Sequence, residues 1–261
     1  MQLLHREHAY ISIDVFGECA NPGYTTAYGQ YWPAISNVVD VIIGYDTGAQ
    51  DWLRERGIDP GTFAAQQIAK ANETLANSCL DEIFSFRLVR AENVGVAVRD
   101  YGAENARSFN RAVMEMQAVY DDAGSGDSPW AAFAQARNDS GADLQMLVAY
   151  TGDTEGTLGL SNGYDSGWSS PARYADYAIG VCEITAAFST YCLVHELGHL
   201  MGAGHASADQ VNPKKIDVGP QFYDDSCAYV FQYGESWYST VMGYWYDGYG
   251  KTLTWIPYFS S

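Results

Sequence analysis

The sequence predicts an α/β (α+β) fold in which a mixed, mostly parallel sheet is backed by helices and followed by a smaller, loop-rich C-terminal part. Three observations predict this fold. Apolar, β-branched runs alternate with longer helical segments before residue 190. A helical segment with three histidines then follows at residues 195–205. Residues 206–261 contain many aromatic residues and glycines and few helix-forming patterns.

The elements expected before residue 150 alternate between strands and helices. Val38–Tyr45 is a β-branched run and is expected to be a central strand. A helix is expected to start at Asp59–Thr62, where a capping residue precedes a proline, and to continue through Ala64–Leu80. The remaining elements are a strand at Phe84–Val89, a helix at about Ala103–Asp121, a short helix at Pro129–Asn138 and a strand at Leu144–Tyr150. This alternation is typical of a mixed sheet covered by helices.

Two short strands and the division of the chain complete the predicted organisation. A short edge strand is expected at Gly156, Thr157, Leu158, Gly159 and Leu160, and another strand at Ala178–Val181. A helix over Thr190–Met201 should carry the first histidines. The expected organisation is an N-terminal extension at residues 1–35, an upper part at 36–205 and a lower part at 206–261.

Residues 195–205 read HELGHLMGAGH and contain three of the five histidines of the chain. His195 and His199 are four residues apart, so on a helix both side chains lie on one face, as zinc ligands require. Along a continuous helix, His205 would lie about 15 Å from His195, at ~1.5 Å per residue, which is too far to share one metal. The helix is therefore expected to end at Gly202, because glycine reaches the positive φ that a chain reversal requires.

Glu196 follows the first histidine directly, where a carboxylate can act as general base on a metal-activated water. The alternative interpretation is an ordinary buried helix that matches the short pattern by chance. The longer pattern, which includes Gly202 and His205, is far more specific in a chain with only five histidines. The sequence therefore predicts a Zn²⁺ site at His195, His199 and His205.

A second motif lies downstream at Ser239–Trp245 and contains Met242. By itself, Met242 would be interpreted as a core residue, because methionine often fills gaps in cores. Together with the histidine motif, it resembles the metzincin zinc peptidases, and most closely their bacterial reprolysin-like (adamalysin-like) members. The resemblance implies that Met242 lies in a turn beneath the three imidazoles. It covers roughly residues 36–261 and is strongest over 190–245.

The resemblance implies a secreted zinc endopeptidase that cleaves proteins or peptides with Glu196 as general base. It also implies that the edge strand binds substrate by strand addition. Astacins and serralysins, the main alternatives for the subfamily, also have a tyrosine at the position of Tyr244, where it can contact zinc. The alternative for Tyr244 is a structural role. Ala206 departs from the Asp that reprolysins usually have after the third histidine. A non-catalytic or latent zinc-bearing binding or toxin module of the same fold is the competing function.

Charge and hydropathy exclude several classes of partner. The net charge of −18 disfavours binding to nucleic acid and to anionic membranes. No apolar run approaches the ~18 residues that a membrane-spanning helix needs. Residues 1–10 contain no apolar stretch of the kind found in a signal peptide. We therefore expect a secreted, monomeric protein whose signal peptide is not present in this chain.

The five cysteines leave at least one thiol free or in an intermolecular bond, and export would allow one or two disulfides. Cys192, three residues before the first histidine, is expected to be a small buried residue and not a ligand. Cys19 could cap the zinc and keep the enzyme latent, as a propeptide cysteine does in some relatives. A disulfide or a free thiol is the alternative for Cys19. Glu183 is expected on the surface or in a loop.

Overall fold

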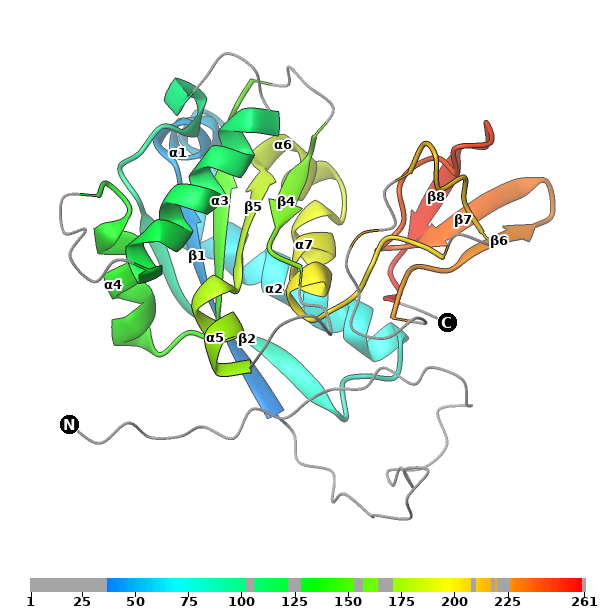
Figure 1. Ribbon diagram of the computed structural model, residues 1–261, viewed down its shortest axis with the longest axis horizontal. Coiled ribbons are helices and arrows are strands. Elements are labelled where there is room, and N and C mark those ends of the chain that lie inside the picture. The colour runs from blue at the N-terminus through cyan, green and yellow to red at the C-terminus, as the bar shows by residue number, and fades with distance from the viewer. Residues whose placement is uncertain are drawn as a thin grey trace.

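Figure 1 shows a computed structural model of the protein, in which a large sheet lies between helices and a smaller sheet lies beside it. The structure describes residues 37–101, 106–121, 128–152, 157–163, 171–207, 210–216, 219 and 226–259. The expected extension at 1–35, including Cys19, lies outside these residues, and so does Gly156. Among the described residues, no helix is both long and apolar enough to cross a membrane.

The large sheet has the strand order β2-β1-β3-β5-β4. The central strand β1 (Asn37–Tyr45) pairs in parallel with β2 (Phe84–Asn93) and with β3 (Leu144–Ala149). β3 pairs in parallel with β5 (Ile179–Glu183), and β4 (Gly159–Ser161) pairs antiparallel with β5 at the edge. The predicted mixed, mostly parallel sheet is thus confirmed.

The strands at the centre of this sheet have apolar side chains on both faces. On β1, Val41 and Ile43 pack in one core and Ile42 packs in the other, as the two-residue period of a strand requires. Both faces of the sheet are covered by helices. Because β1 is buried on both faces at Val41, Ile42 and Ile43, its sequence is apolar without interruption there. The first face is covered by α2 (Pro60–Asn77) and α7 (Cys192–Leu200), and the second by α3 (Ala106–Asp121) and α4 (Ala131–Ser140).

Several short elements were not expected from the sequence patterns. The short helices are α1 (Thr47–Glu55), the 3-10 helix η1 (Val98–Tyr101), α5 (Pro171–Tyr177) and α6 (Ile184–Ser189). In the C-terminal part, a second sheet has the order β6-β7-β8, formed by β6 (Val230–Tyr233), β7 (Ser236–Thr240) and β8 (Leu253–Ile256). β6 and β7 form a hairpin whose turn contains Gly234 at φ 60°, a signal that the sequence carries in this otherwise loop-rich part.

Asp46 joins three segments at the end of β1. Its buried carboxylate accepts hydrogen bonds from the main-chain N–H groups of Ala49, Val98 and Tyr150, at 2.6, 3.0 and 3.1 Å. The bond from Ala49 makes Asp46 the N-cap of α1. Burial raises the pKa of this carboxyl to about 6, although the three hydrogen bonds act in the opposite direction. Asp46 therefore fixes α1 and two loops to the sheet.

We expect Asp46→Ala to lower the free energy of unfolding by about 3 kcal/mol or more, because each buried donor left without an acceptor costs ~1–3 kcal/mol. Asp59→Ala is the matched control, since Asp59 caps α2 at an exposed position and accepts from Thr62. Asp59→Ala should lower the free energy of unfolding clearly less than Asp46→Ala does. Denaturant unfolding of both variants measures the difference, and equal losses would show that Asp46 is no more than an ordinary helix cap.

Candidate metal centre

His195, Glu196 and His199 all lie on α7, and all three side chains are buried. The helix is held against the large sheet by apolar residues that belong to the first core. These residues are Leu193, Val194, Leu197 and Leu200. The two histidines are one helical turn apart and are thereby placed side by side.

The chain reverses directly after α7, as predicted at Gly202. This glycine has φ 91°, a left-handed conformation that residues with a side chain rarely adopt. Its N–H donates to the carbonyl of His199, and the N–H of Ala203 donates to the carbonyl of Gly198, both at 3.0 Å. This pair of bonds is the Schellman motif. The reversal brings His205 back beside α7, where its ring stacks on that of His195 with centroids 5.2 Å apart.

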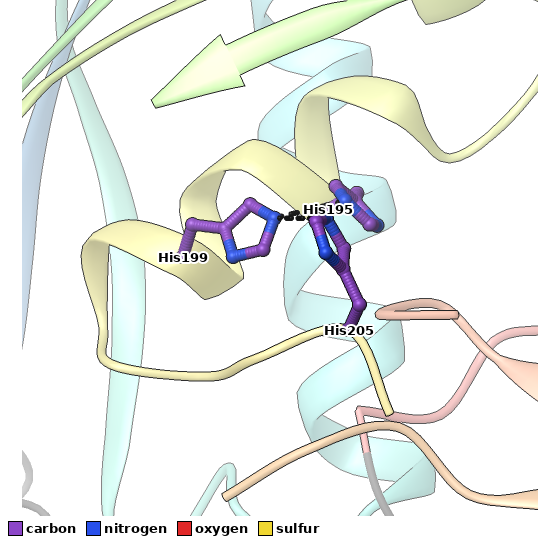
Figure 2. A group of neighbouring side chains, drawn as sticks. All are labelled: His195, His199 and His205. Atoms are coloured by element: carbon purple, nitrogen blue, oxygen red, sulfur yellow. Dashed lines mark hydrogen bonds between the residues drawn. The ribbon is translucent and has the colours of Figure 1, made fainter. Parts of the chain in front are cut away.

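The Nε2 atoms of the three histidines converge on one point (Figure 2). The Nε2 of His199 lies 3.0 Å from that of His195 and 2.9 Å from that of His205. The contacts of the Nδ1 atoms explain why the Nε2 atoms point toward one another. The Nδ1 of His195 lies 2.8 Å from the carbonyl oxygen of Val241, and the Nδ1 of His199 lies 2.7 Å from that of Ala203.

These contacts test whether the three residues suit a metal. A carbonyl oxygen can only accept, so Nδ1 donates in His195 and His199, and the Nε2 of each neutral ring presents a lone pair. Lone pairs facing one another at about 3 Å repel, and a shared cation removes this repulsion. Hydrogen bonds from the outer ring nitrogen to a carbonyl are also the usual support of metal-bound histidine. The cluster fits Zn²⁺, which binds imidazole nitrogen.

Burial keeps the imidazoles in the form that binds metal. It lowers the pKa of His195 to about 3, and the neighbouring His205 acts in the same direction. For His199, burial together with His195 and His205 holds the pKa well below its usual value. Both rings are therefore neutral near pH 7, and a metal need not displace a proton from them.

Met242 lies against α7 at Gly198. It is fully buried, and a Cβ atom added to Gly198 would lie 2.2 Å from its sulfur. Glycine at position 198 therefore lets the methionine sulfur reach the helix backbone. The preceding residue, Val241, supplies the carbonyl that orients His195.

Glu196 points toward the edge strand β4. Its Oε2 accepts a hydrogen bond of 2.5 Å from the Ser161 hydroxyl. A Cβ atom at Gly159 would lie 2.3 Å from its Oε1, so the carboxyl packs directly over that glycine. Burial raises the pKa of Glu196 to about 8, while the hydrogen bond from Ser161 lowers it.

A cleft of about 330 Å³ opens beside the three histidines and Glu196. Of the predicted edge strand, Thr157, Leu158, Gly159 and Leu160 line this cleft, but the strand itself runs from Gly159 to Ser161. The C-terminal part supplies Tyr244, Trp245 and Trp255. The ring of Tyr244 lies 4.4 Å from that of His205, centroid to centroid. The structure thus brings together every predicted site residue that it describes.

Glu183 differs from expectation, and two residues that line the cleft were not expected. Glu183 was expected at the surface or in a loop, and this is wrong. It ends β5, is 2 % exposed, and accepts from the N–H and hydroxyl of Thr151 at 2.9 and 2.7 Å. Ser161 and Trp255 were not singled out; Ser161 directly follows the predicted edge strand, which was the one available signal.

The cysteines agree with the expectations that the structure tests. Cys192 is buried, as predicted, and its thiol donates to the carbonyl of Leu158 at 3.1 Å. Cys182 is likewise a buried thiol, whereas Cys79 is disulfide-bonded. The proposed cap by Cys19 stays a prediction, because that residue lies outside the described part of the chain.

The stability of the metal-free protein is expected to reach a maximum near pH ~6.5. Burial lowers the pKa of His195 to about 3 and of His199 well below 6.5, so below pH 6.5 the unfolded state binds more protons and acid destabilises the fold. Burial raises the pKa of Glu196 from 4.5 to about 8, so the folded state binds the extra proton and stability falls as pH rises toward 8. Thermal unfolding of the metal-free protein and of Glu196→Gln measures this, and the variant should lose the decline between pH 6.5 and 8. A decline unchanged in the variant would show that another group causes it.

Comparison with known proteins agrees with this geometry. The reprolysin-type model of metallo-peptidase family M12 matches residues 36–260. No curated protein sequence matches the chain significantly. A chain in "Structure of a chaperone-substrate complex" is similar in fold, with a TM-score of 0.52 and 18% identity over 92% of this chain and 31% of that chain. Metalloproteinase-II from Bacteroides fragilis gives a TM-score of 0.41 and 13% identity, over 74% of this chain and 50% of that one.

The two solved structures are thus considerably longer than the region they share with this chain, which spans 31% and 50% of their lengths. At 18% identity, the first of them shows the fold alone. The family model, in contrast, covers the large sheet, the histidine motif on α7 and the segment with Met242. The chain belongs to metallo-peptidase family M12.

Proposed function

We propose that this protein is a zinc-dependent endopeptidase in which His195, His199 and His205 hold the metal. The observation that carries the proposal is the convergence of three Nε2 atoms beside the buried carboxyl of Glu196. Membership in a metallopeptidase family supports the same reaction class. A structural zinc site is usually closed by four protein ligands, whereas three leave a position for catalysis.

Bound there, zinc would act as a Lewis acid that polarises the scissile carbonyl and lowers the pKa of a water molecule to ~7. Glu196 would take the proton from the attacking water and then deliver it to the leaving amine. In the metal-free protein burial raises the pKa of this carboxyl to about 8, and a nearby Zn²⁺ would lower it and favour the ionised form that accepts the proton. Tyr244, whose ring packs on that of His205, would donate a hydrogen bond to the substrate carbonyl oxygen during the attack.

The open edge of β4 would bind the peptide in extended form. On its inner side, the carbonyl of Leu158 accepts from Glu183 at 2.8 Å and the N–H of Asn162 donates to Ile179 at 3.0 Å. In an antiparallel pair the bonded residues alternate, so the main-chain groups of Gly159 and Ser161 face away from β5. These main-chain groups are available to a peptide that adds as a further strand. Main-chain pairing of this kind accepts many sequences.

The division of the chain, its secretion and its monomeric state are also part of this proposal. The parts at 36–205 and 206–261 would be the upper and lower subdomains, with the substrate lying between them. The net charge of −18 suits a secreted, monomeric protein that acts on proteins or peptides. The competing proposal is a non-catalytic or latent zinc-bearing module. The placement of Glu196 beside the imidazoles disfavours it, because a binding module has no use for a general base there.

The test is incubation of the purified protein with an unbiased peptide mixture, with zinc measured on the same sample. Cleavage at internal bonds that stops when zinc is chelated and returns with added zinc is expected. One bound zinc per chain without any cleavage would instead favour the binding module. A protein that neither binds zinc nor cleaves any peptide would overturn both proposals.

A further inference from the structure

The edge strand β4 contacts the carboxyl of Glu196 in two ways. The Ser161 hydroxyl lies 2.5 Å from Oε2 and 3.2 Å from the main-chain carbonyl oxygen of Glu196. Among the described residues, Ser161 is the only side chain that hydrogen-bonds to this carboxyl. Two residues earlier, Gly159 packs against the Glu196 side chain. A Cβ atom added to Gly159 would lie only 2.3 to 2.9 Å from the Oε1, Cδ and Cγ atoms of Glu196. The carboxyl is therefore held at the strand by one hydrogen bond and one close packing contact.

The hydroxyl itself is confined by the neighbouring strand. Ser161 pairs with Gly180 of β5, and a Cβ atom at Gly180 would lie 2.8 Å from the Ser161 oxygen. Glycine at position 180 thus leaves the space in which the hydroxyl can turn toward Glu196. The two glycines and the serine form a cradle that a larger residue at position 159 or 180 would block.

We propose that Ser161 is a positioning residue that holds the Glu196 carboxylate against β4, the strand on which the substrate would lie. The inference rests on the proposed function, because it concerns the general base of that reaction. Gly159 and Ser161 are also the residues whose main-chain groups face away from β5, where the peptide would add. One strand thus fixes the distance between the substrate backbone and the proton acceptor. A misplacement of about 1 Å between reacting groups can lower a rate ~100-fold.

Ser161→Ala is therefore expected to lower kcat about 10- to 100-fold and to change KM less than about twofold, since the main chain of β4 still binds the peptide. Ser161→Thr keeps a hydroxyl and should recover most of the lost kcat. Zinc content should match the wild type, which shows that the variant folds around an intact metal site. Ser189→Ala is the matched control and should leave kcat unchanged. Within the described residues, the Ser189 hydroxyl donates only to the carbonyl of Thr185 in α6, at 2.7 Å.

A crystal structure of metal-free Ser161→Ala supplies a readout that does not depend on activity. The carboxyl of Glu196 is expected to leave its place over Gly159. A carboxyl that stays there, a kcat within about twofold of wild type, or a change confined to KM would overturn the role of Ser161. If the wild-type protein cleaves no peptide, the proposed function fails, while the position of Glu196 in this crystal structure still decides whether Ser161 positions it.

Discussion

Glu196→Gln is expected to lower kcat for peptide cleavage about 10²- to 10⁴-fold, the usual contribution of a general acid–base residue. Glutamine has the shape of glutamate, so it can still pack over Gly159 and accept from Ser161. Its amide cannot take a proton from water. The variant should therefore bind zinc like the wild type and fold normally, and the loss should appear in kcat. Steady-state kinetics on one cleaved peptide, with zinc measured on the same sample, gives the result.

Glu73→Gln is the matched control, because Glu73 lies exposed on α2. It should cleave at the wild-type rate. A Glu196→Gln protein that retains both zinc and full activity would assign the proton transfer to another group. Loss of zinc from this variant would also contradict the assignment, since it would make Glu196 a determinant of metal binding.

His199→Ala is expected to abolish both zinc binding and cleavage. The Nε2 of His199 lies within 3.0 Å of the Nε2 atoms of His195 and His205. Its removal leaves the metal only two imidazole ligands. Zinc that binds only the folded wild type stabilises it by about 4 kcal/mol when free zinc is 1,000-fold above the dissociation constant. The variant should show no such gain. Thermal unfolding with and without zinc measures this for both proteins.

Glu196→Gln separates the two effects, since it should keep the zinc-dependent stabilisation while losing activity. A His199→Ala protein that is stabilised by zinc as strongly as the wild type would mean that the metal binds elsewhere. One that still cleaves peptides would rule out a site built from these three histidines.

The features that the sequence predicts correctly are local. The spacing of His195 and His199, and the reversal at Gly202, depend only on helix geometry and on the left-handed conformation of one glycine. The strand at β1 follows from a β-branched run that is buried on both faces. These signals need no knowledge of distant residues.

The features that escape prediction depend on partners far along the chain. Glu183 is buried because Thr151 supplies two donors to its carboxylate, and nothing near Glu183 in sequence indicates this. The contact of Ser161 with Glu196 likewise joins two elements that only the folded sheet brings together. The edge strand is short, so its limits are set by pairing with β5 and not by its own composition.

The ring of His195 is oriented by Val241, and Val241 depends in turn on the segment after β8. The N–H of Val241 donates to the carbonyl of Tyr258 at 2.8 Å, and the N–H of Phe259 donates to the Ser78 hydroxyl at 2.9 Å. The ribosome makes α7 long before it makes these residues. A nascent chain therefore holds its histidine motif while the carbonyl that orients the first ring is still unanchored. The proposed peptidase would therefore become competent only after the segment that holds Tyr258 and Phe259 has been made and has packed against Val241 and Ser78.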